Sequence, residues 1–261
     1  LFELREDHRD RGRKVLAGLG LPPDAWYVTL HAREPGYRDN GGFSEDFRNV
    51  NPDSYIQAIK EVTSAGGWVF RMGDQNMTPM KPMPQVIDYA HGQYRSDWMD
   101  VFLFATSRFT IGTSSGPFII SRLFGVPVLL TNLLPTFAIY MLSGHDIYLP
   151  RLCRNSANGE LLSFRELFAP PISTFFSSMA YETHGLQWIE NTTEELAMAT
   201  REMLTHSGGL VADAPTGCVE LHTKCQKLCT EAVLKHGGIE TPINPRMATG
   251  FLQAHAKLLD L

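Results

Sequence analysis

The sequence lacks the features that would place the chain within a membrane, on nucleic acid or in a disulfide-stabilised scaffold. No run approaches the roughly 18 apolar residues of a membrane span, and the charged segment 1–14 is not a signal peptide. The net charge of −5 creates no general attraction to nucleic acid or to an anionic membrane. Four cysteines are too few for a disulfide framework and fit reduced thiols. We therefore expect a cytoplasmic protein, or one peripheral to the inner membrane, without a nucleic-acid partner.

Two signals for metal and triphosphate binding are also missing. The chain has no Asp-x-Asp triplet, an acidic pattern that would hold a metal ion on a diphosphate, and no P-loop lysine. Its one cysteine cluster has helical spacing, at Cys218, His222, Cys225 and Cys229. At a rise of about 1.5 Å per residue, the outer two would lie about 16 Å apart along a helix, too far for one tetrahedral zinc ion. We expect neither a metal site nor a cofactor.

What the sequence does contain is an alternation of short apolar runs with longer, mostly amphipathic stretches. The apolar runs predict buried strands at 26–30, 68–72 and 86–89, a strand that leads into the turn 112–116, and a strand that ends at Asn132. The longer stretches predict helices at 3–19, 53–65, 96–106 and 118–124. This alternation favours an α/β, Rossmann-like fold with a mostly parallel sheet and ligands at the carboxyl ends of its strands.

The chain divides into two predicted parts. Residues 1–190 are expected to form the Rossmann-like domain, with one further strand near 186–189. Residues 191–261 are expected to form a helical C-terminal extension that packs on it, with helices at 192–205, 217–236 and 245–259. Residues 35–52 form a polar loop longer than most connections, which indicates a functional loop.

The turn Gly112-Thr113-Ser114-Ser115-Gly116 is the first candidate binding site. It links an apolar strand to an apolar helix, so its hydroxyls and N–H groups would face an anion at a helix N-terminus. Glycine at both ends would let a ligand approach the backbone closely. The serines could also serve only as helix N-caps. If the turn binds phosphate, the candidate ligands are Thr113, Ser114, Ser115 and Gly116.

A second candidate site, His31-Ala32-Arg33-Glu34, ends another predicted strand about eighty residues earlier. Two sites at the carboxyl ends of parallel strands indicate a single cleft. Arg33 is a strong candidate because an arginine that ends a buried strand has few structural reasons to be there. His31 either lines the same site or is a core histidine bonded to the backbone.

Polar residues end two further predicted strands. Arg71 and Asp74 flank the end of the strand 68–72, where they could hold a nucleotide or pair with each other. Asn132 ends the strand that follows the turn, and we expect its side chain to face the cleft.

Together these segments resemble the C-terminal, nucleotide-sugar-binding half of a GT-B glycosyltransferase. The segments that carry the resemblance are H-A-R-E-P-G-Y at 31–37, G-G-W-V-F-R-M-G-D at 66–74, I-D-Y-A at 87–90, W-M-D-V-F-L-F-A-T-S-R-F-T-I-G-T-S-S-G at 98–116 and F-G-V-P-V-L-L-T-N at 124–132. They are similar to a bacterial glycosyltransferase family that is itself distantly similar to the fucosyltransferase and protein O-fucosyltransferase superfamily. The resemblance covers roughly residues 1–135. It departs from the superfamily at Glu34 and Pro35, where many members have a second basic residue and an aspartate.

The resemblance implies roles for individual residues. Arg33 would contact the diphosphate of a nucleotide sugar with His31 beside it, and Ser114 and Ser115 would contact the β-phosphate. Asp100 matches an acidic position that lies near the nucleoside in relatives, or is a solvated helix residue. A fixed guanidinium with oriented hydroxyl and N–H donors would stabilise the charge that grows on the β-phosphate as the glycosyl bond breaks, without a metal ion.

An inverting transfer also needs a base that accepts the proton of the acceptor hydroxyl. Glu34 and Asp46 lie in or beside the long loop and are the candidates. Glu34 could instead form an ion pair that orients Arg33. Arg71 could assist Arg33 at the diphosphate.

The resemblance thus implies a glycosyltransferase that moves a sugar from a nucleotide-diphosphate donor, GDP-linked in the superfamily, to a hydroxyl acceptor in bacterial polysaccharide or glycoconjugate assembly. Two alternatives stay open: a nucleotide-sugar epimerase or hydrolase of the same architecture, and a non-catalytic nucleotide- or glycan-binding module. Because a GT-B enzyme has two domains around its site and this chain has room for one, we expect a missing N-terminal domain or a partner chain to complete the cleft.

Overall fold

A computed structural model of the chain describes residues 1–35, 46–134, 141–208, 218–235 and 245–259. The strands of its central sheet are β1 (Tyr27–His31), β2 (Trp68–Arg71), β3 (Val86–Ile87), β4 (Thr110–Gly112), β5 (Val128–Leu133), β6 (Ile147–Pro150) and β9 (Arg246–Met247). They lie in the order β3-β2-β1-β4-β5-β6-β9, and each neighbouring pair is parallel. The predicted α/β, Rossmann-like fold with a mostly parallel sheet is therefore confirmed.

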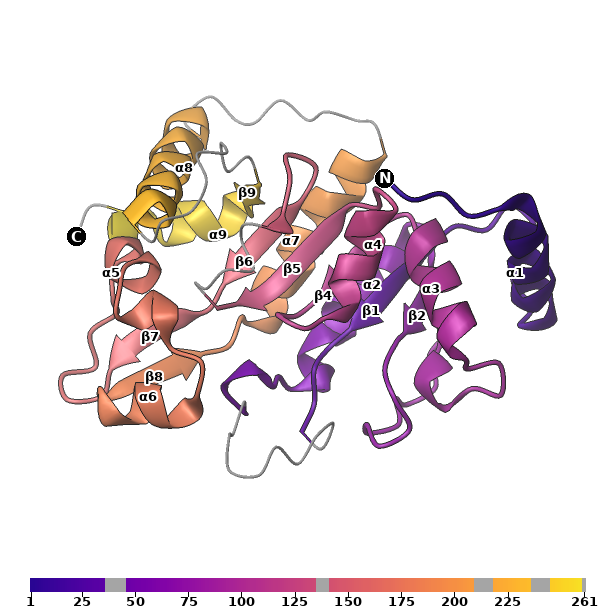
Figure 1. Cartoon of the computed structure of the whole chain (residues 1–261), viewed down its shortest axis with the longest axis horizontal. Coiled ribbons are helices and arrows are strands. Elements are labelled where there is room, and N and C mark those ends of the chain that lie inside the picture. The colour runs from indigo at the N-terminus through magenta and orange to yellow at the C-terminus, as the bar shows by residue number, and fades with distance from the viewer. Residues whose placement is uncertain (36–45, 135–140, 209–217, 236–244, 260–261) are drawn as a thin grey trace.

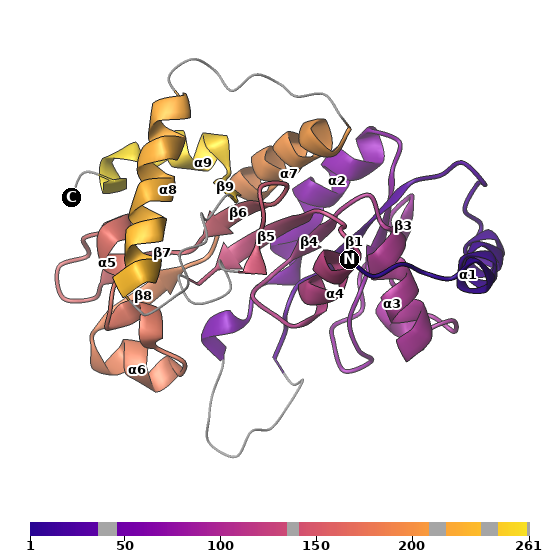
Figure 2. The same ribbon diagram turned by 45° about the horizontal axis from the view of Figure 1, so that its top comes forward.

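Helices cover both faces of this sheet (Figure 1). They are α1 (Glu6–Gly18), α2 (Ile56–Ser64), α3 (Asp97–Thr106), α4 (Pro117–Leu123), α5 (Phe164–Phe168), α6 (Ser178–Thr183), α7 (Thr193–Ser207), α8 (Cys218–Lys235) and α9 (Thr249–Ala254). α2 packs against α7 on one face, and α3 packs against α4 on the other (Figure 2). α1 lies against α3 at one end of the molecule. In the part of the chain that the structure describes, none of the helices has the length and apolar character needed to cross a membrane.

Local sequence signals explain where these elements form. β1, β4 and β5 are buried along their whole length, which is why their sequences are mostly apolar instead of alternating. α3 begins after Ser96, whose hydroxyl accepts a hydrogen bond from the N–H of Met99. α7 begins with a capping box formed by Thr192 and Glu195. Both helices therefore begin one residue after the predicted position.

The strand order reverses at β1, and this reversal positions the site. From β1 the chain passes through α2 to β2 on one side, whereas β4 lies on the other side and leads through α4 to β5. Loops that leave the carboxyl ends of strands at such a reversal diverge and leave a crevice between them. His31 is paired in register with Gly112, so the two segments predicted as binding sites begin side by side.

A second, smaller sheet lies outside the central one. β7 (Leu152–Asn155) pairs antiparallel with β8 (Leu186–Ile189), which is the strand predicted near 186–189. α5 and α6 accompany this sheet at the end of the molecule opposite α1 (Figure 1). We call residues 151–190 the β7–β8 unit.

The C-terminal segment differs from the single helix predicted at 245–259. Residues 246–247 form β9, because the N–H groups of Arg246 and Ala248 bond to the carbonyl groups of Asp146 and Tyr148 along the edge of β6. α9 and a short 3-10 helix (Ala256–Leu259) follow. The extension predicted as helical thus contributes a strand to the sheet. The predicted division at residue 190 stays a prediction.

Candidate functional site

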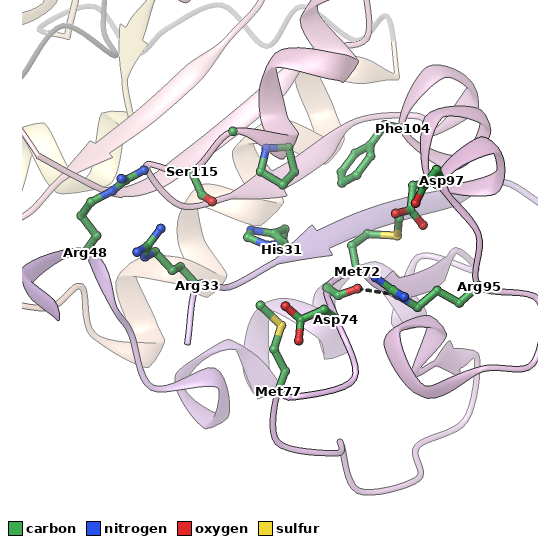
Figure 3. A pocket seen from close by; sticks show the side chains of 14 residues that line it. His31, Arg33, Arg48, Met72, Asp74, Met77, Arg95, Asp97, Phe104 and Ser115 are labelled. Carbon is green, nitrogen blue, oxygen red and sulfur yellow. Dashed lines mark hydrogen bonds between the residues drawn. The ribbon is translucent and has the colours of Figure 1, made fainter. Parts of the chain in front are cut away.

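A cavity of about 530 Å³ lies at the carboxyl ends of β1, β2 and β4. Figure 3 shows its two ends: Arg33, Arg48 and Ser115 gather on one side, and Met72, Arg95, Asp97 and Phe104 on the other, with His31 between them. The volume is in the range of sites that hold small molecules. We call the two sides the arginine end and the α3 end.

Arg33 is fixed at the arginine end through contacts on both sides of its backbone. Its N–H donates to Thr113 Oγ1 at 3.2 Å, and its carbonyl accepts from the N–H of Val50 at 2.9 Å. Its Nε donates to Asn49 Oδ1 at 3.3 Å. The guanidinium is half-buried and lines the cavity.

Arg48 lines the same end and was missed by sequence reasoning. It belongs to a 3-10 helix, η1 (Asp46–Arg48), that follows the part of the long loop, residues 36–45, outside the described ranges. Its Nε donates to the carbonyl of Ser114 at 2.8 Å, and its NH2 group donates to the same oxygen. The signal that could have found it was a basic residue in a loop already predicted to be functional.

In the glycine-flanked turn 112–116, two residues support the site from outside the cavity and two line the cavity. Thr113 and Ser114 are buried and do not line the cavity: Thr113 holds Arg33, and the Oγ of Ser114 accepts from Leu134 N–H at 3.4 Å. Ser115 and Gly116 do line it, and the Ser115 hydroxyl points toward the space between Arg33 and His31 (Figure 3).

The serines do not cap the following helix. The N-cap of α4 is Gly116, and no side chain caps it. A Cβ added to Gly116 would meet no atom within 4 Å, and one added to Gly112 would make only ordinary contacts. The glycines are therefore not required by crowding within the protein.

His31 lies between the two ends and is buried. Burial, and then the positive charges of Arg71 and Arg33, lower its pKa to about 4. The imidazole is therefore neutral near pH 7, and it lines the cavity. It would meet a ligand as a hydrogen-bonding group without a net charge.

The α3 end combines carboxylates with apolar surface. Asp100 is half-buried, burial raises its pKa, and its Oδ1 has no hydrogen-bond partner in the described part of the chain. Arg95 donates through Nε to the carbonyl of Gly73 at 3.1 Å. Met72 and Phe104 supply the apolar wall. Arg95 and Asp97 were not predicted, although Asp97 begins α3 and Arg95 lies two residues before it.

The turn after β2 carries Asp74 and Met77 into the cavity. Gly73 has a φ of +152°, and a Cβ there would lie 2.2 Å from the sulfur of Met77. Only glycine therefore fits this turn without displacing Met77. The Oδ1 of Asp74 accepts from the N–H of Asn76 at 2.7 Å, which closes the turn.

Glu34 and Arg71 lie in a buried network that does not line the cavity. Arg71 NH2 donates to Glu34 Oε1 at 2.5 Å, and its NH1 donates to Asp88 Oδ1 at 3.2 Å. The second oxygen of Glu34 accepts from Thr78 N–H at 3.0 Å. The suggested pairs Glu34 with Arg33 and Arg71 with Asp74 are therefore wrong, because the buried guanidinium of Arg71 takes both Glu34 and Asp88 as partners.

Asn132 and Asp46 do not line the cavity either. The backbone N–H of Asn132 donates to Asn191 Oδ1 at 2.6 Å, its Oδ1 accepts from Asn191 N–H at 2.9 Å, and its Nδ2 donates to Tyr55 OH at 3.1 Å. The expectation that Asn132 faces the cleft is wrong, because this buried pairing uses its amide. Asp46 begins η1 and accepts a hydrogen bond from Nδ2 of Asn49, the residue after η1, at 2.9 Å.

The cysteine cluster lies on α8, as its spacing predicted. Cys218, His222, Cys225 and Cys229 are buried, and the hydroxyl of Tyr148 lies 3.5 Å from the sulfurs of Cys225 and Cys229. Across the described ranges, no group of three or more His, Cys, Asp or Glu side chains is arranged to hold a metal ion.

Comparison with known proteins gives a distant structural neighbour. No protein-family model matches the sequence, and a search of curated proteins finds no match. The structure is similar to the crystal structure of a glycosyl transferase family 9 protein from Veillonella parvula DSM 2008, with a TM-score of 0.43 and 14% sequence identity. The similarity covers 57% of this chain and 42% of that one, so the chain spans less than half the length of its neighbour.

Proposed function

We propose that the cavity binds a nucleotide sugar and that the chain is the donor-binding part of a glycosyltransferase. The observation that carries this proposal is the arginine end, where Arg33, Arg48 and the Ser115 hydroxyl meet beside a neutral His31. The location at a strand-order reversal of a parallel sheet supports it, because nucleotides bind there in folds of this class.

Two guanidinium groups suit a diphosphate. Arginine forms short, charge-assisted hydrogen bonds to phosphate oxygens and stays protonated at every relevant pH. Contacts with Asn49 and the Ser114 carbonyl hold the two side chains before a ligand arrives. Donors held in advance stabilise the charge that develops on the leaving diphosphate as the sugar departs.

The α3 end has the character of a nucleoside site. The unpartnered Oδ1 of Asp100 and the carboxylate of Asp97 are acceptors for ribose hydroxyl or base N–H groups. Met72 and Phe104 offer an apolar surface to a ring. With the nucleoside at the α3 end, the diphosphate would reach the arginine end and His31 would lie beside it.

The finer assignments rest on the resemblance at 31–37 and 112–116. It favours kinship with the fucosyltransferases and a GDP-linked donor. It also favours metal-independent transfer to a hydroxyl acceptor, with a second domain or partner chain on the acceptor side. Glu34 and Asp46 do not line the cavity, so we assign neither as the base.

Isothermal titration of the chain with GDP, UDP, ADP and CDP tests the proposal. At least one diphosphate should bind, and Arg33→Ala and Arg48→Ala should each weaken it about tenfold or more, because a hydrogen bond to a charged group contributes about 1.5–3 kcal/mol. Arg13→Ala is the matched control, since Arg13 is an exposed arginine on α1. Absence of binding by all four nucleotides, or equal affinities in Arg33→Ala and Arg13→Ala, would contradict the proposal.

A further inference from the structure

Arg151 is a buried arginine outside the cavity that holds the backbone on both sides of Arg48. It directly follows β6 and is 3% exposed. Its NH1 donates to the carbonyl of Phe47 at 2.6 Å, and its NH2 donates to the carbonyl of Asn49 at 2.5 Å. One planar guanidinium thus spans the two peptide carbonyls that flank Arg48.

Other contacts attach the same segment to the β7–β8 unit. The N–H of Phe47 donates to Ser178 Oγ at 3.3 Å, and the Phe47 ring lies 5.3 Å from the ring of Tyr181. The N–H of Asn51 donates to Glu190 Oε2 at 3.2 Å. Residues 47–51 are therefore held by residues about one hundred or more positions later in the chain (Figure 1).

The held segment supplies two contacts to the arginine end. Arg48 itself lines the cavity and donates to the Ser114 carbonyl, and Asn49 accepts from Arg33 Nε. A displacement of residues 47–49 would therefore move Arg48 and break the contact between Asn49 and Arg33. We propose that Arg151 is a positioning residue that fixes both anion-binding arginines through this segment; the inference rests on the proposed function, since it takes the arginine end as an anion site.

A contribution to stability does not by itself explain why an arginine is buried at position 151. Burying a guanidinium is unfavourable unless carboxylates compensate, and its nearest carboxylate oxygen, on the half-exposed Glu190, lies 3.9 Å away. Burial accordingly lowers its pKa, against the opposing charge of Glu190. Its Nε also has no hydrogen-bond partner among the described residues. Lysine would match the two carbonyls less well, because its three N–H groups donate from a single nitrogen, whereas two guanidinium nitrogens donate in one plane.

The first test needs no ligand. Phenylglyoxal modifies exposed arginines, and the rate at Arg48 can be followed by mass spectrometry in the wild type, Arg151→Met, Arg151→Lys and Arg154→Met. Arg154 is the matched control because it is exposed in β7 and bonds to Gln187, away from residues 47–51. We expect Arg48 to be modified severalfold faster in Arg151→Met and in Arg151→Lys, and at the wild-type rate in Arg154→Met. Equal rates in all four proteins would overturn the inference.

The second test measures affinity for inorganic pyrophosphate by calorimetry. Arg151→Met should weaken binding about tenfold, the scale of one lost charge-assisted hydrogen bond. In the double variant Arg48→Ala/Arg151→Met, the loss of binding free energy should be smaller than the sum of the losses in the two single variants. The reason is that part of the effect of Arg151→Met acts through Arg48, which the double variant lacks. If Arg151→Lys restores wild-type affinity, charge and not the planar guanidinium is what matters, and the inference is overturned.

If Arg151→Met fails to fold, Phe47→Ala provides a second test of the positioning role. Phe47→Ala deletes the packing on Tyr181 and leaves Arg151 in place. Like Arg151→Met, it should raise the rate of Arg48 modification and weaken the affinity for pyrophosphate. Failure of the wild type to bind pyrophosphate or any nucleoside diphosphate would overturn the proposed function. Unchanged Arg48 reactivity in Arg151→Met and Phe47→Ala would overturn only the positioning role.

Discussion

Arg33 follows β1 and Arg71 ends the adjacent parallel strand β2, but the two arginines lie in different environments. Arg33 is half-buried at the cavity, where Asn49 fixes one side of its guanidinium. Arg71 is 2% exposed and is bonded to Glu34, Asp88 and the Thr78 carbonyl.

The carboxylates that bind Arg71 come from the ends of two strands. Glu34 and Asp88 come from the ends of β1 and β3, on either side of β2, and both reach Arg71. A buried guanidinium with two carboxylates has its hydrogen-bonding capacity and charge compensated within the protein. Arg33 is half-buried, bonds through Nε to Asn49 and lines the cavity, where an anionic ligand can reach it. Arg71 is therefore a buried, structural arginine, whereas Arg33 is placed where a ligand can reach it.

The largest expected effect is on stability when Glu34 is removed. Glu34→Ala leaves Arg71 buried with one carboxylate, and it should lower the free energy of unfolding by about 3–5 kcal/mol. Urea unfolding measures this. Glu61→Ala, which breaks the more exposed pair with Arg201, is the control and should change the value by less than about 1 kcal/mol. A comparable loss in Arg33→Ala would remove the distinction between the two arginines.

His31 lies near both arginines and should make stability depend on pH. Its pKa is about 4 in the folded chain, below its usual 6.5. The unfolded chain therefore binds a proton first, and stability present above pH 6.5 is lost as pH falls toward about 4. Because one pKa unit corresponds to about 1.4 kcal/mol, His31 should account for about 3 kcal/mol of that loss.

Urea unfolding of the wild type and His31→Gln at several pH values between about 4 and 7.5 measures this contribution. The variant should lose about 3 kcal/mol less than the wild type across the window. Parallel pH profiles for the two proteins would show that burial and the neighbouring charges do not lower the pKa of His31 as described.

Asn132 tests whether the second buried network is also separate from binding. Asn132→Ala removes the bonds to Asn191 N–H and Tyr55 OH, and it should lower the free energy of unfolding by about 2 kcal/mol. Affinity for nucleoside diphosphates should not change by more than about twofold, since Asn132 does not line the cavity. Calorimetry beside urea unfolding checks both parts. A large loss of affinity at unchanged stability would show that Asn132 contributes to binding.

The smallest expected effect is that of magnesium. If Arg33 and Arg48 provide the positive charge for a diphosphate, its affinity should be the same within about twofold with magnesium and with EDTA. Titration under both conditions measures this. A strong requirement for magnesium would mean that the two arginines are not sufficient at the arginine end.

Much of the fold could be predicted because its signals are local. Buried strands have continuous apolar sequences, and helices such as α3 and α7 begin at side chains that cap their own N–H groups. The order of strands and helices then implied the parallel sheet and the edge where a site would form. Five of the proposed residues at that edge, His31, Arg33, Asp74, Ser115 and Gly116, line the cavity, as does Asp100 from α3.

The rest depended on contacts between distant segments. Arg48 and Arg95 were missed because neither ends a predicted strand, and the partner of Glu34 was misassigned because Arg71 is thirty-seven positions away. Arg151 could not be assigned a role from its neighbours, because Phe47 and Asn49 meet it across about one hundred residues.

The sequence by itself determined the α/β class, the strand ends and the presence of polar groups at one edge of the sheet, since periodicity and capping act within a few residues. The tertiary structure alone decided which polar groups face the cavity. That choice depends on which groups from distant segments come within hydrogen-bonding distance of each arginine: Arg71 is buried between Glu34 and Asp88, whereas Arg33 and Arg48 bond to Asn49 and to the Ser114 carbonyl and line the cavity.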